Sequence, residues 1–185
     1  TCSGGMDYND NVAASGFSSL RNGQLLSEDF SSYPYPSDWT VGGDWTRSYT
    51  YPSYDYYMYV SSYNAGGDTL LTPVMDLTAV DNVILEMDAK LMKGENSVKV
   101  FAVSNDTWTM IRHFTAADSL PEFTKEQIDL AEYQEAEDFQ VAWVVDSLSQ
   151  SFYLDNVYVG LPRQRDLAIK KFNCRKVLFL KEEPL

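Results

Sequence analysis

The sequence is poor in the residues from which metal centres and catalytic triads are built. Its 185 residues include two cysteines, Cys2 and Cys174, and a single histidine, His113. The cysteines lie far apart in sequence, so a zinc site with closely spaced ligands is not expected. The chain also has no Gly-x-Ser-x-Gly turn, the usual setting of a hydrolase serine. These absences argue against zinc chemistry and against serine or cysteine nucleophiles.

Basic residues are scarce as well. Lys and Arg number 14 against 27 Asp and Glu, and the formal net charge is -13. The segment up to Pro162 holds seven basic and twenty-four acidic residues, whereas the remaining tail holds seven basic and three acidic. An acidic body repels phosphate backbones, so we expect no nucleic-acid partner. Calcium, neutral sugars and secretion are compatible with this charge.

Long hydrophobic runs are absent too. No apolar stretch approaches the roughly 20 residues of a membrane-spanning helix, so we expect no transmembrane segment. Two interpretations of Cys2 stay open. It can pair with Cys174 if the ends of the chain meet. Alternatively, Cys2-Ser3-Gly4-Gly5 and the polar residues after it resemble the mature start of a bacterial lipoprotein, with a lipid anchor at Cys2 and a flexible tether over residues 1–24.

What the chain does have is alternation of apolar and polar residues, the pattern of half-buried strands. Residues 83–91 show it most clearly, and residues 98–102 repeat it after a turn at 93–96, so these two runs predict a hairpin. Further strands are expected at 25–30, 45–49, 56–61, 69–71, 108–114, 141–145 and 152–158, with a short helical turn within 130–138. Many short strands separated by turns predict an all-β fold. We expect a two-sheet antiparallel jelly-roll sandwich over residues 25–162, of the concanavalin-like or galactose-binding-like kind.

A series of short motifs occurs along this segment in a recognisable order. They are Glu28-Asp29-Phe30, Pro36-Ser37-Asp38-Trp39, Gly42-Gly43-Asp44-Trp45, Leu70-Leu71-Thr72-Pro73-Val74-Met75-Asp76-Leu77, Trp108-Thr109, Asp129-Leu130 and Phe152-Tyr153-Leu154-Asp155-Asn156-Val157. Together they resemble the cleaved-adhesin or MAM-like jelly-roll domains of secreted bacterial proteins, also called choice-of-anchor J domains. The resemblance implies a secreted or cell-surface location, a role in adhesion or glycan binding, and often a structural Ca²⁺ ion. Asn156 departs from the pattern, because many relatives carry a second aspartate there.

Three acids are the candidate ligands for such a calcium ion. Calcium takes six to eight oxygen ligands. Glu28, Asp68 and Asp155 would converge if the family topology places the first and last strands side by side, and Asp44 is a spare candidate. In so acidic a chain, the same residues can equally be solvated acids in turns and at sheet edges. Both interpretations stay open.

Tyrosine is concentrated in one part of the chain. Residues 28–63 hold nine of the thirteen tyrosines. Tyrosine rings cover the apolar faces of sugars, while amides and carboxylates supply hydrogen bonds. The candidate glycan-binding residues are Tyr51, Tyr54, Asp55, Tyr56 and Asn64. Alternatively, Tyr57 and Tyr59 pack inward and their neighbours merely cover the sandwich, or the patch contacts another protein. Trp39 and Trp45 are expected to be core rings.

Two carboxylates on one strand also raise an enzymatic hypothesis. Glu86 and Asp88 resemble, superficially, the acidic signature of laminarinase-like glycoside hydrolases. Retaining hydrolases hold two carboxylates about 5 to 5.5 Å apart, whereas same-face neighbours on a strand are about 7 Å apart. Lys90 stands where a further acid would be expected. We therefore predict no enzymatic activity.

Taken together, these features predict a non-catalytic extracellular module that binds a glycan or a cell-surface protein. A protein-assembly module without sugar affinity is the alternative, and a sandwich-fold glycoside hydrolase is the third hypothesis. Residues 163–185 become basic and alternate again, which predicts a C-terminal hairpin or the start of a following module.

Overall fold

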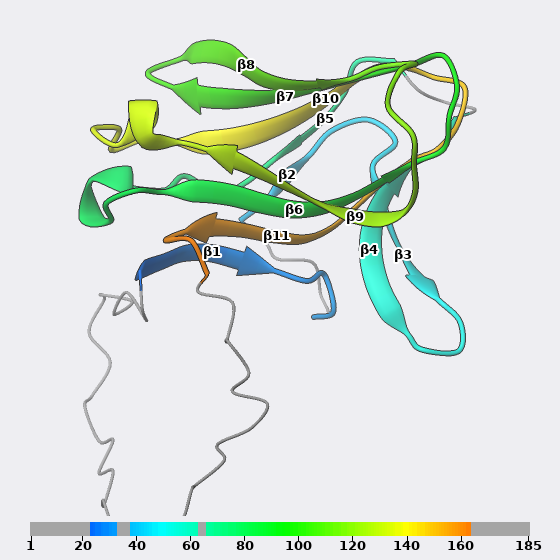
Figure 1. Ribbon diagram of the computed structural model, residues 1–185, viewed down its shortest axis with the longest axis horizontal. Helices are drawn as coiled ribbons and strands as arrows, with labels where there is room; N and C mark the ends of the chain where they lie inside the picture. The colour runs from blue at the N-terminus through cyan, green and yellow to red at the C-terminus, as the bar shows by residue number, and fades with distance from the viewer. Residues whose placement is uncertain (1–22, 33–37, 63–65, 164–185) are drawn as a thin grey trace, which may run out of the picture.

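The computed structural model describes residues 23–32, 38–62 and 66–163 of the chain. They form two antiparallel β-sheets packed face to face (Figure 1), which confirms the predicted all-β sandwich. Within these residues, no helix is long and apolar enough to cross a membrane. Cys2, Asn64 and Cys174, with nearly all of the proposed tether and tail, lie outside the described residues.

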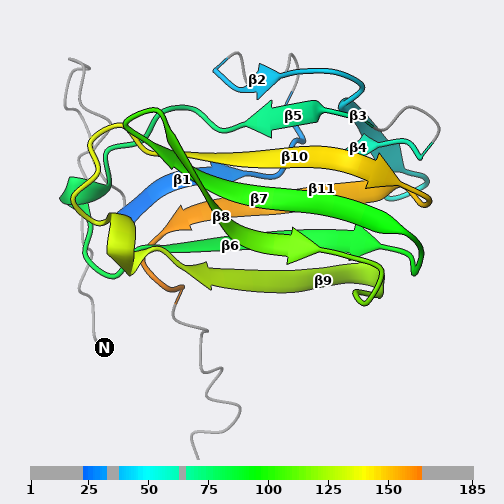
Figure 2. The ribbon, with the colours of Figure 1, turned by 90° about the horizontal axis from the view of Figure 1, so that it is seen from above.

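Each sheet is assembled from strands that are distant in sequence. Sheet A consists of β1 (Gln24–Glu28), β3 (Thr46–Thr50), β4 (Asp55–Val60), β6 (Ile84–Leu91), β9 (Leu120–Asp129) and β11 (Phe152–Gly160), in the order β3-β4-β11-β6-β9 with β1 also beside β11. Sheet B consists of β2 (Thr40–Val41), β5 (Asp68–Leu71), β7 (Asn96–Ser104), β8 (Thr107–Phe114) and β10 (Gln140–Leu148), in the order β2-β5-β10-β7-β8 (Figure 2). The short 3₁₀ turns η2 (Leu77–Ala79) and η3 (Ala131–Tyr133) lie in connections. The single helical turn predicted within residues 130–138 is confirmed as η3, between β9 and β10.

The core lies between the two sheets and is filled from the inward face of each strand. Leu85, Met87, Ala89 and Leu91 of β6 are fully buried, as their alternation predicts. Each such large side chain contributes about 1.5 to 3 kcal/mol when it leaves water. Rings complete the filling: Trp39 stacks on Trp143 with 6.1 Å between centroids and meets Phe30 edge-on at 5.4 Å. Trp39 and Trp45 are both buried, so their expected place in the core is confirmed.

The hairpin predicted for residues 83–91 and 98–102 is wrong. β6 belongs to sheet A and β7 to sheet B, so the connection between them carries the chain from one sheet to the other. The buried side chain of Asn96 stabilises this crossing, because its amide donates to the Met92 carbonyl while its oxygen accepts from the backbone of Ser149 and Gln150. Alternation shows that each strand has one buried face, and it does not distinguish two neighbours in a sheet from two strands facing each other across a core.

Strand β9 was not among the predicted strands. It is an edge strand of sheet A, and most of its side chains are exposed, so its sequence lacks a continuous apolar row. One polar contact closes the sandwich at this edge. Arg112 of β8 donates to Glu126 of β9 at 3.2 Å and to Asp118 at 2.7 Å. The Arg112–Glu126 pair joins the two sheets, and the Arg112–Asp118 pair holds the connection between β8 and β9.

Candidate functional site

A break in the pairing of β11 creates a concavity at the outer face of sheet A. One side of β11 pairs with β4 over residues 152–154 and with β1 over residues 157–160. Asp155 and Asn156 lie between these two pairings, and the register with β6 on the other side shifts at the same point. Asn156 has a left-handed backbone, with φ of 48°. Bulges of this kind bend a strand and re-aim its side chains, and they are common beside functional sites.

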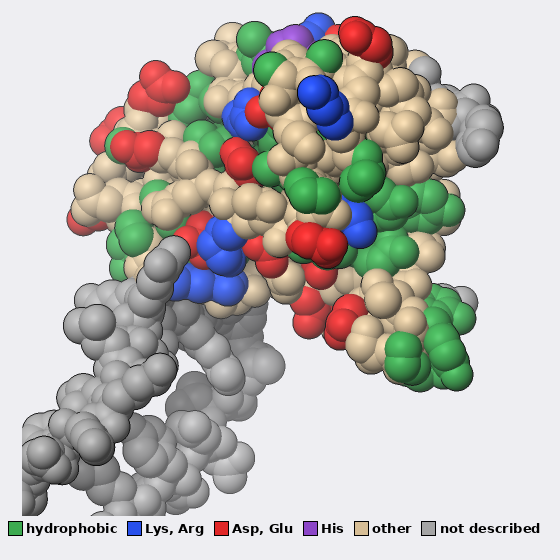
Figure 3. Space-filling model, turned by 45° about the vertical axis from the view of Figure 1, so that its right-hand side comes forward, with side chains coloured by type: hydrophobic (Ala, Val, Ile, Leu, Met, Phe, Trp, Pro, Cys, Tyr) green, Lys and Arg blue, Asp and Glu red, His purple; other side chains and the backbone are tan. Residues whose placement is uncertain are grey.

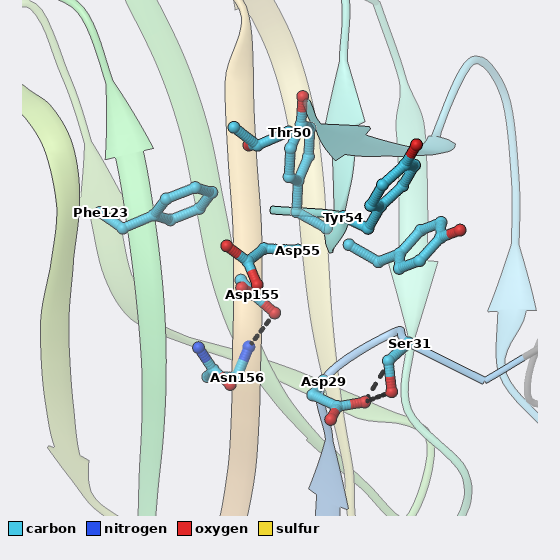
Figure 4. A pocket seen from close by; sticks show the side chains of 10 residues that line it. Asp29, Ser31, Thr50, Tyr54, Asp55, Phe123, Asp155 and Asn156 are labelled. Carbon is cyan, nitrogen blue, oxygen red and sulfur yellow. Dashed lines mark hydrogen bonds between the residues drawn. The ribbon is translucent and has the colours of Figure 1, made fainter. Parts of the chain in front are cut away.

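The resulting cleft has a volume of about 380 Å³. Its lining residues are Asp29, Ser31, Thr50, Tyr54, Asp55, Tyr56, Tyr57, Phe123, Asp155 and Asn156. Figure 4 shows the side chains of Asp55 and Asp155 pointing into the same space, with Phe123 to one side and Asp29 to the other. The cleft therefore combines carboxylates, an amide, hydroxyls and ring surfaces.

One wall of the cleft is fixed by Arg47 of β3. Its guanidinium donates to the carbonyl of Phe30 at 2.5 Å and to that of Ser31 at 2.9 Å. The same group covers the ring of Tyr56, 3.8 Å from its centroid. Because Phe30 is itself buried, these contacts hold the chain leaving β1 against the β3–β4 hairpin. On this side, the cleft is therefore bounded by the backbone of Phe30 and Ser31, which Arg47 holds in place.

An aromatic platform adjoins the cleft on the outer face of sheet A. It consists of Tyr57 and Tyr59 of β4, Tyr153 of β11 and Phe123 of β9. Tyr57 contacts Tyr153 and Phe123 at centroid distances of 5.5 and 5.8 Å, and Tyr59 stacks on Tyr153 at 5.9 Å. Lys90 of β6 lies over the ring of Tyr153 at 5.5 Å. Tyr57 and Phe123 belong to both the platform and the cleft, so the two form one continuous surface.

The carboxylates of this surface differ in their pKa. Burial, together with the negative charges of Asp88, Asp29 and Asp55, raises the pKa of Asp155 to about 7 against the opposing hydrogen bond from the Asn156 backbone. By contrast, hydrogen bonds from the hydroxyl and backbone of Ser31 lower the pKa of Asp29 below its usual value. Asp155 and Asp88 are direct cross-strand partners, an arrangement of like charges that destabilises a sheet. Electrostatic strain of this kind is typical of functional sites.

The tyrosines proposed from the sequence as glycan ligands lie mainly at the tip of the β3–β4 hairpin. Tyr54 stacks on Tyr49 with 5.5 Å between centroids and meets Tyr51 edge-on at 6.0 Å. Tyr51 is 76% exposed and Tyr54 is 56% exposed. Figure 3 shows this hydrophobic tip projecting from the body, with acidic side chains between the two. Of the residues proposed, Tyr54, Asp55 and Tyr56 line the cleft, whereas Tyr51 does not.

The alternative placement of Tyr57 and Tyr59 in the interior is wrong. Met58 and Val60 fill the inward positions of β4, so Tyr57 and Tyr59 take the outward positions between them. Tyr56 instead packs partly against the core. The sequence run Tyr56-Tyr57-Met58-Tyr59 is apolar or amphipathic at every position, and its alternation therefore gives no indication of which face is buried.

The three candidate calcium ligands are divided between the sheets. Glu28 and Asp155 belong to the neighbouring strands β1 and β11 of sheet A, whereas Asp68 belongs to β5 of sheet B. Asp68 is buried and accepts from the backbone of Asp44, while its second oxygen has no partner. In the part of the chain that the structure describes, no three His, Cys, Asp or Glu side chains are grouped to hold a metal ion. A bound Ca²⁺ stays a prediction.

The two acids of the hydrolase hypothesis are engaged by one lysine. Lys125 of β9 lies 3.8 Å from a carboxylate oxygen of Glu86 and 3.7 Å from one of Asp88. Asp88 also accepts a hydrogen bond from the Asn156 side chain at 2.9 Å. Glu86 is buried. Both carboxylates of the hypothesis therefore already have a cationic partner within the protein.

Phe123, Tyr153 and Asn156 were not among the proposed site residues. They come from β9 and β11, whose proximity to β4 depends on the strand order rather than on sequence. Of these residues, only Tyr153 could have been identified from the sequence. Its apolar neighbours Phe152 and Leu154 are buried, so alternation along β11 places Tyr153 on the outer face of sheet A. A large ring at such a position indicates a surface used for binding.

Comparison with solved structures shows which known folds share this architecture. The K1 and K3 cleaved adhesin domains of Lys-gingipain from Porphyromonas gingivalis W83 both match with a TM-score of 0.58, at 18% and 16% sequence identity. The matches cover 76% and 75% of this chain and 99% and 98% of those domains. The C-terminal family 22 carbohydrate-binding module of Clostridium thermocellum Xyn10B matches with a TM-score of 0.52 at 13% identity, over 76% of this chain and 96% of the module.

The likeness to cleaved adhesin domains inferred from short motifs is thus confirmed at the level of the fold. No family model matches the sequence, and no curated protein matches it.

Proposed function

We propose that this chain is a non-catalytic binding module that works outside the cell, either secreted or held at the cell surface, and recognises glycans. The outer face of sheet A is the binding surface. The aromatic platform receives the apolar faces of pyranose rings, and the cleft receives polar groups of a neighbouring sugar unit.

The observation that carries this proposal is the continuity of the platform with the cleft. The rings of Tyr57 and Phe123 belong to both the platform and the cleft. Asp155, Asn156 and Ser31 supply hydrogen-bonding groups in the same cleft. Sugar sites combine these two kinds of surface, because each sugar ring has an apolar face and a polar edge. The shared fold with adhesin domains and with a carbohydrate-binding module supports the same proposal.

Protein assembly without sugar affinity is the second candidate function. The outer face of sheet B favours it, because Trp108 and Met110 of β8 are 46% and 52% exposed and Phe101 of β7 meets Trp108 edge-on at 5.6 Å. This patch offers ring surface without adjacent carboxylates in a cleft. Exposed apolar patches of this composition are typical of protein contacts.

Glycan hydrolysis is the least supported candidate. Lys125 contacts both Glu86 and Asp88, as described above, so neither carboxylate is directed at the cleft alone. Asp155, with its raised pKa, would then be the acid of any hydrolytic pair. We expect no release of reducing sugar from any polysaccharide that the chain binds, and release that Asp155→Asn abolishes would establish an enzyme.

A glycan array followed by affinity electrophoresis tests the proposed function. We expect the wild-type chain to bind a defined set of polysaccharides and Tyr57→Ala to bind them much more weakly. Tyr57 is an outward residue, so its truncation leaves the core intact.

Trp108→Ala is the matched control, because it removes an exposed ring from the opposite sheet. It should bind as the wild type does. Absence of any glycan binding, or an equal loss in both variants, would overturn the proposed function and leave protein assembly as the better account.

A further inference from the structure

The cleft is lined by several acids and by no base. Among its ten lining residues, Asp29, Asp55 and Asp155 carry carboxylates, and none is Lys, Arg or His. The nearest opposing charge on β9, Lys125, is directed to Glu86 and Asp88. Some other carboxylates of the described surface do have a basic partner, as in the pairs Lys99–Asp146 and Arg112–Asp118. Within the described residues, Asp55 and Asp155 form no ion pair, whereas the positive charge of Arg47 acts on Asp29.

The spacing of these carboxylates does not suit a small ion. No three acidic side chains of the described residues are grouped as metal ligands, although four aspartates surround the cleft. They come from the end of β1, the start of β4, the middle of β11 and the adjoining position of β6. Carboxylates spread around a cavity of about 380 Å³ suit a cation of organic size, whose charge can face several of them at once.

The rings of the cleft are suited to the same kind of ligand. Tyr57, Tyr56, Tyr54 and Phe123 border the space into which Asp55 and Asp155 point (Figure 4). The faces of aromatic rings attract cations, most strongly where water is partly excluded. A positively charged group on an apolar frame can thus contact carboxylate and ring face together.

We propose that the ligand of this cleft is a cationic glycan, in which a protonated or quaternary amino group on a pyranose occupies the cleft while the adjoining sugar unit lies on the platform. The proposal rests on the proposed function and adds the chemical class of the ligand. The amino group adds a positive charge beside Asp155, whose cross-strand partner Asp88 is contacted by Lys125 and by the Asn156 amide.

A sugar fits this surface better than the lysine of a protein partner does. The platform of Tyr57, Tyr59, Tyr153 and Phe123 continues directly from the cleft and offers ring surface to a second pyranose unit. A single lysine side chain would fill the cleft and leave the platform uncovered. Stacked rings beside a charged pocket match a chain of sugar units.

Isothermal titration with a matched pair of ligands tests the proposal. The cationic probe is an N-trimethylated chitosan hexamer, whose charge does not depend on pH, and the neutral probe is the N-acetylated hexamer of the same length. We expect the cationic probe to bind about tenfold more tightly at low salt, and this advantage to shrink as salt screens the charges.

Three variants locate the effect. Asp155→Asn and Asp55→Asn each remove a charge from the cleft while keeping the shape of the side chain, so each should lower the ratio of cationic to neutral affinity severalfold. Asp106→Asn removes one charge from the β7–β8 turn in sheet B, at a left-handed position that Asn also adopts readily. It should leave the ratio of cationic to neutral affinity unchanged. This control distinguishes binding in the cleft from the non-specific attraction of any acidic protein for a polycation.

The outcomes separate this inference from the proposed function. If both hexamers bind equally and Tyr57→Ala weakens both, the chain binds glycans but the inference about charge is overturned. If neither binds while a lysine-rich peptide binds and depends on Asp155, the ligand is a protein and both proposals fail. A preference that survives Asp155→Asn and Asp55→Asn, or that falls equally in Asp106→Asn, would also contradict the inference.

Discussion

The two outer faces of the sandwich both carry aromatic rings, yet they differ in what surrounds those rings. On sheet A, the platform tyrosines stand next to Asp155, Asn156 and Lys90 and lead into a cleft. On sheet B, Phe101, Trp108 and Met110 form an apolar patch on neighbouring strands. Both faces therefore expose aromatic rings. Sheet A differs because polar side chains lie beside its rings.

An irregularity in one strand of sheet A accounts for this difference between the two faces. The bulge at Asp155–Asn156 interrupts the pairing of β11, and the interruption brings polar side chains next to outward rings. Sheet B also has a register shift, in its β7–β8 pair, but the cleft described above is lined by residues of sheet A and its connections. A sugar requires both kinds of contact, whereas a protein surface can bind through apolar area alone.

The largest expected effect comes from removing rings on each face in turn. Tyr57→Ala combined with Tyr153→Ala should weaken glycan binding about 30-fold, or about 2 kcal/mol, because both outward rings of the platform centre are lost. Trp108→Ala combined with Met110→Ala should leave glycan affinity unchanged. Titration of both double variants with the same oligosaccharide measures the comparison. Equal affinity losses would mean that the two faces do not differ in function.

A smaller effect is expected in the pH dependence of stability. Because the folded state raises the pKa of Asp155 from 3.8 to about 7, the native carboxyl holds its proton more tightly than the unfolded one. Its contribution to stability is therefore present below about pH 4 and is lost as the pH rises to about 7. At pH 8, Asp155→Asn should raise the free energy of unfolding by about 1 to 2 kcal/mol, since solvent screens part of the full penalty.

Urea unfolding of the wild type and of Asp155→Asn across this pH range measures the difference. The two curves should converge toward acid pH, where the wild-type carboxyl is protonated. A constant difference between the two proteins at all pH values would show that the carboxyl at position 155 is not destabilised by its surroundings.

A still smaller effect should follow from removing the lysine beside the cleft. Lys125→Ala leaves Glu86 and Asp88 without their shared ammonium group and should cost about 0.5 to 1 kcal/mol of stability, because these contacts of 3.7 and 3.8 Å are partly exposed. Thermal unfolding at low and high salt checks this. A loss that does not depend on salt would indicate a packing role for the lysine rather than an electrostatic one.

The smallest change in stability is expected on sheet B. Trp108→Ser with Met110→Ser replaces two exposed side chains and should alter the free energy of unfolding by no more than about 0.5 kcal/mol. If this face meets another protein copy, the double variant should also lower self-association in sedimentation experiments. A large loss of stability would show that the patch is part of the folded core.

The sequence predicts the class of fold well and its connections less well. Alternation in residues 83–91 and 141–145 correctly identifies β6 and β10, because each has one fully buried face. It does not identify β9, whose side chains are mostly exposed at the sheet edge. Nor does it reveal that β6 and β7 lie in different sheets, because that depends on long-range pairing with β11 and β10.

The candidate site was predictable only in part, for the same reason. Tyrosine enrichment led to Tyr54, Asp55 and Tyr56, which do line the cleft. It also led to Tyr51, which lies outside the cleft at the hairpin tip, and it missed Tyr153 and Phe123. Those two meet Tyr57 through strand pairings that span about half of the chain. Local sequence reports which residues can contact a sugar, and the strand order determines which of them lie together.

The most direct test of glycan recognition by sheet A is to map the bound oligosaccharide on the protein by amide chemical-shift changes in solution. We expect the changes to cluster at residues 55–59, at Phe123 and at residues 153–156, which contribute to the cleft and the platform. Changes confined to residues 101–110 of sheet B, or to the exposed hairpin tip around Tyr51, would contradict it.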